Sequence, residues 1–117
     1  MTTVLIIEQD DATRELYQRE VGRSFHVLSS SDAESALQLM QNNHIDAVVL
    51  EPAMADGAGW HLLEALPRMQ PGAPAPVILC SVLDERKRGK SLGAAAYLVK
   101  PVLPAALLDT LDHILQG

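Results

Sequence analysis

Several residues that could do chemistry stand where short apolar runs of this sequence end. Glu8, Glu51 and Lys100 each follow such a run directly, and Cys80 and Ser81 end another. Carboxylates are ligands for divalent cations. An ammonium group and a hydroxyl can both donate hydrogen bonds to the oxygens of a phosphoryl group. These residue types are therefore suited to holding a cation and a phosphoryl group, provided that one fold brings them together.

The apolar runs are short and bounded by turn residues, which is typical of strands that are covered on both faces. The sequence predicts five strands, at Val4–Ile7, His26–Ser29, Ala47–Leu50, Val77–Cys80 and Ala95–Val99.

Helical patterns alternate with these strands. The first is predicted over Ala12–Gly22, and the second follows Ser31–Glu34, which has the spacing of a capping box. The others are predicted over Trp60–Met69, where Pro67 is expected to end or kink the helix early, over Asp84–Leu92, and from Pro104 onward.

Strands that alternate with helices predict an α/β fold, a doubly wound parallel sheet with helices on both faces. In such a sheet the carboxyl ends of the strands meet at one edge, so we expect Glu8, Glu51, Ser81 and Lys100 to share a pocket there. The segment after the first strand, Gln9–Asp11, has no glycine-rich phosphate loop, which disfavours a dinucleotide-binding fold.

The bulk composition narrows the functional classes. The 117 residues predict one domain spanning residues 1–117, and a hydrophobic fraction of 48% argues against disorder. The net charge of −6 argues against broad binding of nucleic acid or anionic membranes. We expect a cytoplasmic protein, because the single cysteine forms no internal disulfide and no signal peptide or membrane span is readable.

Four segments together give the sequence a family resemblance. They are V-L-I-I-E-Q-D-D at the start, A-V-V-L-E-P-A-M-A-D-G-A-G in the middle, P-V-I-L-C-S, and G-A-A-A-Y-L-V-K-P near the end. In this order and spacing, the chain resembles the receiver domain of bacterial response regulators (the CheY-like family) over essentially its whole length. The resemblance implies a flavodoxin-like (βα)5 fold with strand order 2-1-3-4-5. It also implies phosphorylation of an aspartate by a histidine kinase, with Mg²⁺ bound beside that aspartate.

The resemblance assigns roles to individual residues, with departures at important positions. Glu8, Gln9 and Asp10 match the acidic pocket, but Gln9 stands where the family has a metal-binding acid. Glu51 stands at the position of the phosphoacceptor aspartate. Asp10 has a second interpretation, as the cap of the first helix.

The remaining matches lie in the second half of the chain. Ser81 matches the hydroxyl that reports phosphorylation, Tyr97 matches the rotating aromatic residue, and Lys100 matches the family lysine. Val82 stands where the family has a very small residue, so it is expected to crowd access to the pocket.

These departures predict a receiver that does not accept a phosphoryl group in the usual way. Replacing Asp by Glu moves the carboxylate outward by one methylene, about 1.5 Å, and phosphoryl transfer depends on such placement. We expect Glu51 to reach Lys100 directly and form an ion pair without a metal. No cofactor is expected, and Glu8 and Glu51 could form only a weak Mg²⁺ site.

The basic residues suggest how such a domain would act. Arg86, Lys87, Arg88 and Lys90 lie within five positions, which indicates either a solvated helix face or a docking patch for an acidic partner. By the resemblance, the partner is a histidine kinase, a phosphotransfer protein or an output domain. A homodimer through the fourth helix, fifth strand and fifth helix could use Asp109 and Asp112 as counter-charges.

Two other functions remain open from the sequence. The first is a working Mg²⁺-dependent receiver that is phosphorylated on Glu51 or another acid. The second is a small-molecule sensor on a flavodoxin-like fold, which would need an open pocket at the strand ends.

Overall fold

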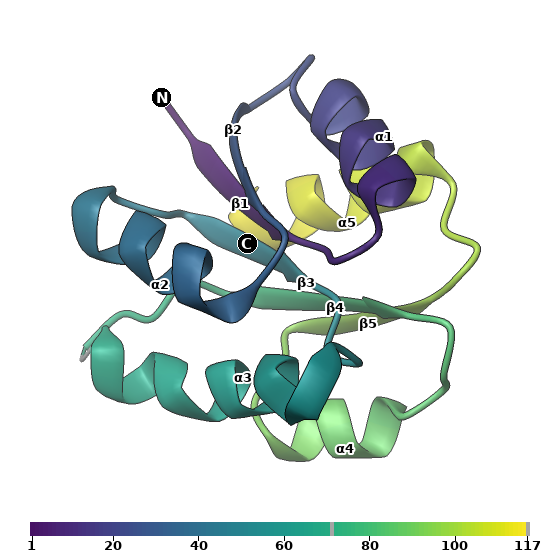
Figure 1. Ribbon diagram of the computed structural model, residues 1–117. Coiled ribbons are helices and arrows are strands. Elements are labelled where there is room, and N and C mark those ends of the chain that lie inside the picture. The colour runs from purple at the N-terminus through teal and green to yellow at the C-terminus, as the bar shows by residue number, and fades with distance from the viewer. Residues whose placement is uncertain (71, 117) are drawn as a thin grey trace.

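The computed structural model describes residues 1–70 and 72–116, in which strands and helices alternate along the chain (Figure 1). The strands are β1 (Thr3–Ile7), β2 (His26–Ser30), β3 (Ala47–Leu50), β4 (Val77–Ser81) and β5 (Ala96–Val99). The helices are α1 (Asp11–Val21), α2 (Ala33–Asn42), α3 (Ala58–Met69), α4 (Arg86–Ser91) and α5 (Pro104–Gln116), and a short 3-10 turn, η1 (Ala55–Gly57), precedes α3. Every predicted strand and helix is present, with small shifts at the ends.

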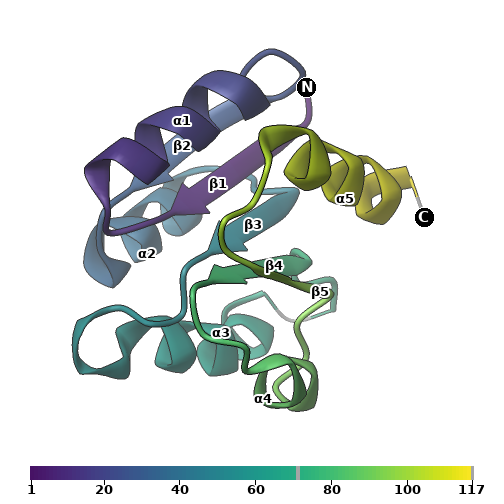
Figure 2. The same ribbon diagram turned by 90° about the vertical axis from the view of Figure 1, so that its right-hand side faces the viewer.

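The five strands form one parallel sheet in the order β2-β1-β3-β4-β5, which confirms the predicted fold class and topology. Figure 2 shows α1 and α5 on one face of the sheet, and α2, α3 and α4 on the other. Because all strands run in the same direction, the residues that follow β1, β3 and β5 emerge at one edge.

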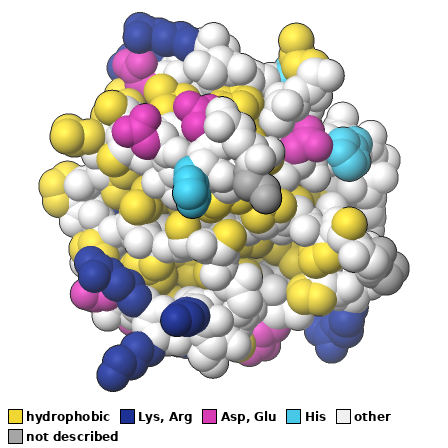
Figure 3. Space-filling model, turned by 180° about the vertical axis from the view of Figure 1, so that it is seen from behind, with side chains coloured by type: hydrophobic (Ala, Val, Ile, Leu, Met, Phe, Trp, Pro, Cys, Tyr) yellow, Lys and Arg dark blue, Asp and Glu magenta, His cyan; other side chains and the backbone are white. Residues whose placement is uncertain are grey.

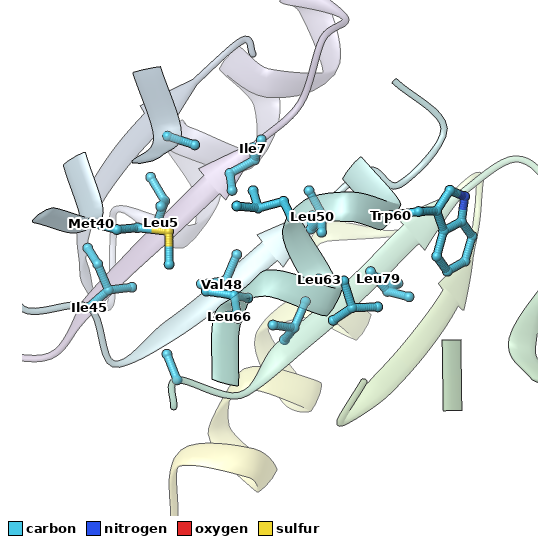
Figure 4. Close-up of a cluster of buried hydrophobic side chains, with 14 of the residues drawn as sticks. Leu5, Ile7, Met40, Ile45, Val48, Leu50, Trp60, Leu63, Leu66 and Leu79 are labelled. Atoms are coloured by element: carbon cyan, nitrogen blue, oxygen red, sulfur yellow. The ribbon is translucent and has the colours of Figure 1, made fainter. Parts of the chain in front are cut away.

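The core has two layers, one on each face of the sheet. Successive residues of a strand point to opposite faces. Leu5 therefore packs with Leu50 and Leu63 in the layer beneath α2 and α3, which Figure 4 shows. Val4 packs with Leu107 in the layer beneath α1 and α5. The two layers cover β1 and β3 from both sides, so the residues at the ends of these strands are held on a rigid base.

Two local expectations need correction. The predicted capping box is wrong: Asp32, not Ser31, caps α2, and its side chain accepts a hydrogen bond from the Ser35 backbone N–H at 2.7 Å. A carboxylate is as good an N-cap as a hydroxyl, so the spacing alone did not decide between the two residues. Pro67 does not end α3, which continues to Met69, because the proline lies in the last turn, where few hydrogen bonds remain to be lost.

Among the described residues, no helix is both long enough and apolar enough to cross a membrane.

Candidate functional site

The sheet itself fixes the three residues at the centre of the site. The Glu8 backbone N–H donates to Ser30 O of β2 at 3.0 Å, and the Glu51 N–H donates to Ile7 O of β1 at 2.9 Å. The Lys100 N–H donates to Ser81 O of β4 at 2.8 Å. Each residue thus extends the hydrogen-bond ladder by one step past its strand, and its side chain starts from a rigid position.

The Lys100 side chain lies between the two glutamates. Its Nζ donates to Glu51 Oε1 at 3.0 Å and to Glu8 Oε1 at 2.5 Å. The predicted contact between Glu51 and Lys100 is confirmed. The second contact, to Glu8, was not predicted, because the sequence gives no measure of how far the lysine reaches.

The second oxygen of each carboxylate is bound by its own loop. Glu51 Oε2 accepts the Ala53 backbone N–H at 3.1 Å, and Glu8 Oε2 accepts the Asp10 backbone N–H at 3.1 Å. All four carboxylate oxygens therefore have a donor. This set of bonds holds both side chains in one orientation, and the extra methylene of Glu51 lets its carboxylate span from its own loop to Lys100.

The three charged groups are largely removed from solvent. The side chains of Glu8, Glu51 and Lys100 are 4%, 10% and 14% exposed. Burial by itself lowers the pKa of Lys100, but the hydrogen bonds to Glu8 and Glu51 outweigh it, and the net pKa is raised above the ordinary value. Lys100 is therefore a firmly protonated cation that partly neutralises two carboxylates.

An open hollow of about 480 Å³ lies over this cluster. Its walls are Glu8, Gln9, Asp10, Asp11, Glu51, Ala53 and Lys100. Val82 is not among them, and its expected effect on access to this hollow stays a prediction. Val82 is 67% exposed and lines a neighbouring hollow of about 380 Å³, whose other walls include Leu16, Tyr17 and Lys100.

The donor set fits Mg²⁺ poorly in this arrangement. Mg²⁺ is octahedrally coordinated, and in proteins its ligands are one or two carboxylates together with water and phosphate oxygens. Such a site needs carboxylate oxygens that are free to bind the ion. Here the lysine ammonium lies between Glu8 and Glu51, and their remaining oxygens are bound to backbone amides. Within residues 1–70 and 72–116, no group of three or more His, Cys, Asp and Glu side chains is arranged to hold a metal ion.

Comparison with known proteins identifies the family. The sequence profile of the response regulator receiver domain matches residues 4–112. The chain belongs to the response regulator receiver domain family. It is 35% identical over 117 residues to the sensory/regulatory protein RpfC of Xanthomonas campestris pv. campestris (strain 8004), covering 95% of this chain and 16% of RpfC. It is 31% identical over 117 residues to the response regulator MprA of Mycobacterium sp. (strain KMS), covering 97% of this chain and 50% of MprA. The receiver chain thus spans only part of the length of these relatives.

Solved structures support the same fold. The chemotaxis response regulator CheY4 of Vibrio cholerae superposes with a TM-score of 0.88 at 23% identity, covering 97% of this chain and 98% of CheY4. The BeF3-activated DrrB receiver domain gives a TM-score of 0.89 at 21% identity, covering 100% of this chain and 99% of that domain. At this level of identity the likeness concerns the fold alone.

Two residues expected in the acidic pocket of the receiver have different environments. Asp10 caps α1: its Oδ2 accepts the Thr13 backbone N–H at 2.9 Å and the Thr13 hydroxyl at 2.7 Å. These bonds lower the pKa of the Asp10 carboxyl, so it stays ionised. Gln9 is exposed and only lines the hollow. Of the acidic set, Glu8 alone reaches the centre.

Ser81 and Tyr97 meet at the loop between β4 and α4. Ser81 is fully buried, and its Oγ accepts the Leu83 backbone N–H at 3.3 Å. The Tyr97 hydroxyl donates to Leu83 O and accepts the Glu85 backbone N–H at 3.2 Å. Among the described residues, the Ser81 hydroxyl has no hydrogen bond to Glu51. The structure therefore joins these two residues to the loop and not to the glutamate.

The basic run lies in α4, and one of its residues also contacts α3. Arg86 pairs with Asp84 at 3.3 Å and Arg88 with Glu85 at 3.6 Å, at exposed positions. The Arg88 guanidinium also lies 4.1 Å from the centre of the Trp60 ring, a cation–π contact. Trp60, predicted from the sequence only as the start of a helix, is buried. Its arginine partner was missed, because nothing in the spacing relates positions 60 and 88.

Cys80 is a free cysteine that packs as a small buried hydrophobic residue. It is 1% exposed, and burial raises the pKa of its thiol to about 12, so the reactive thiolate is suppressed.

Proposed function

We propose that this receiver domain works as a binding module and not as a phosphate-accepting one, with Glu51 as a permanent charge in place of the aspartate. The observation that carries the proposal is the bridging lysine: Lys100 contacts Glu8 and Glu51 while Ala53 binds the other Glu51 oxygen. No Glu51 oxygen is left without a donor. In-line attack on a phosphodonor needs a free and correctly placed carboxylate, and misplacement by about 1 Å can cost a hundredfold in rate.

A domain of this kind needs no cofactor. The ammonium group of Lys100 neutralises charge on Glu8 and Glu51, as Mg²⁺ does in a phosphorylatable receiver. Gln9, in place of an acidic residue, leaves the hollow with one carboxylate fewer. Glutamate carries about one negative charge, whereas a phosphorylated side chain carries about 1.5 to 2. Glu51 therefore imitates a phosphorylated residue only in part, and the domain remains in one state until a protein partner binds.

The partner surface in this proposal is formed by α4, β5 and α5. Figure 3 looks onto the molecule from behind and shows a hydrophobic area with a cluster of Lys and Arg below it and Asp, Glu and His side chains above. Lys87 and Lys90 on α4 are exposed, as are Asp109 and Asp112 on α5. A histidine kinase, a phosphotransfer protein or an output domain is the class of partner, and a cytoplasmic location is implied. A homodimer through the same face is the alternative arrangement.

The experiment that tests the proposal is incubation with a small phosphodonor and Mg²⁺, followed by intact-mass measurement. We expect no added phosphoryl group on the native chain. A phosphoryl group that appears on the native chain and disappears in Glu51→Gln would show a working phosphoreceiver and overturn the proposal. The Glu64→Gln variant, which removes an exposed carboxylate of α3, is the matched control.

One observation favours a second function. The hollow of about 380 Å³ beside Lys100 is walled by apolar side chains, among them Leu16 and Val82, and its volume is within the range of small-molecule sites, roughly 300 to 1,000 Å³. A sensor would bind an apolar molecule there. A thermal-shift screen with Leu16→Gln as the negative control separates the two functions, since a pure protein-binding module gives no stabilisation that depends on Leu16.

A further inference from the structure

A further pocket lies between α4 and the start of β5. It has a volume of about 280 Å³ and is lined by Arg86, Lys90, Ala94, Ala95, Ala96 and Tyr97. Two features of the sequence create it. Three consecutive alanines leave space where larger side chains would fill it, and Arg86 and Lys90 are four residues apart, which places both on one face of α4.

The pocket is electropositive. Its lining holds two cations, and no carboxylate from the described residues contributes to it. Lys90 has no ion-pair partner in residues 1–70 and 72–116, and Arg86 has only Asp84, in a pair whose side chains are 64% and 58% exposed. Such an exposed pair contributes little, so Arg86 can exchange Asp84 for another carboxylate. The pocket therefore favours an anionic group.

The pocket opens beside an unpaired strand edge. β5 is the last strand of the sheet and pairs only with β4 among the described residues, as Figure 2 shows. An edge strand offers N–H and C=O groups along its free side, and a partner in extended conformation can hydrogen-bond to them. The alanine side chains of Ala95 and Ala96 leave room for such an approach.

From these three features, we propose that an acidic, extended segment of a different protein docks along the free edge of β5. One of its Asp or Glu side chains inserts between Arg86 and Lys90. The inference rests on the proposed function, in that it specifies the chemistry of the partner that the α4–β5–α5 surface binds. The volume of about 280 Å³ is below the usual range for small-molecule sites and accommodates one side chain.

A second copy of this chain that pairs through its own β5 does not supply that segment. Residues 92–104, which contain β5 and both its flanks, include no Asp or Glu. Pairing of β5 with β5 of another copy therefore brings no carboxylate from the strand into either pocket. The proposal therefore assigns the acidic residue to another protein.

Tyr97 connects the pocket to the loop near the site. Tyr97 lines the pocket, while its hydroxyl donates to Leu83 O and accepts the Glu85 backbone N–H. The wall facing the docked segment is thus held in place by the loop that follows Ser81. An occupant of the pocket contacts the side chain through which the loop is fixed.

The test uses fluorescence anisotropy with a labelled short peptide of alternating Glu and Thr. We expect saturable binding that weakens as salt rises from about 0.05 to about 0.2 M. Arg86→Gln and Lys90→Gln should each weaken binding about two- to fivefold, as for exposed charge pairs. Lys87→Gln is the matched control, since it removes the same charge from the same helix outside the pocket and should leave the affinity unchanged.

A second variant supplies the carboxylate from within the chain. Ala95→Glu should block the peptide, whereas Ala106→Glu, which adds the same charge to an exposed position of α5, should not. Undetectable binding of the acidic peptide, equal binding of a Lys–Thr peptide, or an equal effect of Lys87→Gln would each overturn the proposal. If acetate displaced the labelled peptide as effectively as unlabelled peptide does, the pocket would be a general anion site and strand docking would be excluded. None of these outcomes depends on phosphorylation, so the proposed function is judged separately by mass measurement.

Discussion

Lys100 and Glu51 are 49 residues apart in sequence, yet Nζ of the lysine lies 3.0 Å from Oε1 of the glutamate at the carboxyl edge of the sheet. Parallel pairing causes this proximity, because β3 and β5 flank β4 and end at the same edge. Glu8 completes the cluster from β1, at 2.5 Å from the same nitrogen. One lysine thus neutralises part of the charge of two buried carboxylates. Removing this lysine is the most direct test of whether the ion pairs stabilise the site.

The Lys100→Met variant should be strongly destabilised. It keeps the aliphatic stem but leaves Glu8 and Glu51 buried without a cation, and breaking a buried ion pair in this way costs roughly 3–5 kcal/mol. Urea unfolding of the two proteins measures the difference. Lys87→Met, at an exposed position, is the control and should lie within about 0.5 kcal/mol of the native chain. A Lys100→Met variant as stable as this control would show that the cluster is well solvated.

Stability should fall at alkaline pH, and three groups give this direction. The pKa of Lys100 is raised in the folded protein, so its contribution is complete below the ordinary value of about 10.4 and is lost as pH rises through the folded value. Burial raises the pKa of Tyr17 to about 12, so the unfolded chain releases that proton first, from about pH 10 upward. Burial raises the pKa of the Cys80 thiol to about 12 as well, so the unfolded chain releases that proton first, from about pH 8.5 upward. All three groups hold more protons when folded.

Urea midpoints between about pH 8 and 11 measure this dependence. The decrease should begin at about pH 8.5, where the unfolded Cys80 thiol ionises, and become shallower above about pH 10 in Tyr17→Phe, which cannot ionise. A midpoint that stays constant to pH 11 would contradict all three raised values.

Gly89→Ala should destabilise the protein although alanine favours helices. A Cβ at position 89 would lie 2.8 Å from Leu79 Cδ1 and 2.9 Å from Tyr97 Cδ2. Overpacking of this kind costs about 1–3 kcal/mol, whereas the gain in helix propensity is at most about 1 kcal/mol. Displacement of the Tyr97 ring should also break the hydrogen bonds of its hydroxyl to Leu83 O and the Glu85 N–H. Changed NMR signals of the loop between β4 and α4 would report this loss. Ser91→Ala, at an exposed position of the same helix, provides the control. A stabilised Gly89→Ala variant would mean that the ring moves aside at no cost.

How well the sequence predicts a structural feature depends on how far apart the residues that form it lie along the chain. Strands such as Ala47–Leu50 were predicted because their apolar runs are local, and the parallel order followed from the alternation with helices. The contact of Lys100 with Glu51 was predictable because both residues end strands that flank β4 at the same edge of a known topology. The contact with Glu8 was not predicted, since it depends on the length and rotamer of the lysine side chain.

Details that depend on side-chain competition were also beyond the sequence. Ser31 and Asp32 both suit an N-cap, and only the backbone path selects Asp32. Val82 was expected to crowd access to the acidic pocket, and it lines the neighbouring hollow with Leu16 and Tyr17. Its effect on access stays a prediction.

The Gln9→Asp/Glu51→Asp double variant should gain Mg²⁺ binding and acceptance of a phosphoryl group. Shortening residue 51 by one methylene withdraws its carboxylate by about 1.5 Å, which weakens the contact with Lys100 and frees an oxygen. Aspartate at position 9 adds a carboxylate to the hollow that now contains Glu8 and a neutral amide, and carboxylates are the ligands that Mg²⁺ prefers. Calorimetry with Mg²⁺ and intact mass after a phosphodonor measure the two gains. Each single variant should gain less than the double, because one provides the metal ligand and the other the acceptor. A double variant that neither binds Mg²⁺ nor is phosphorylated would show that positions 9 and 51 are not what separates this chain from a phosphorylatable receiver.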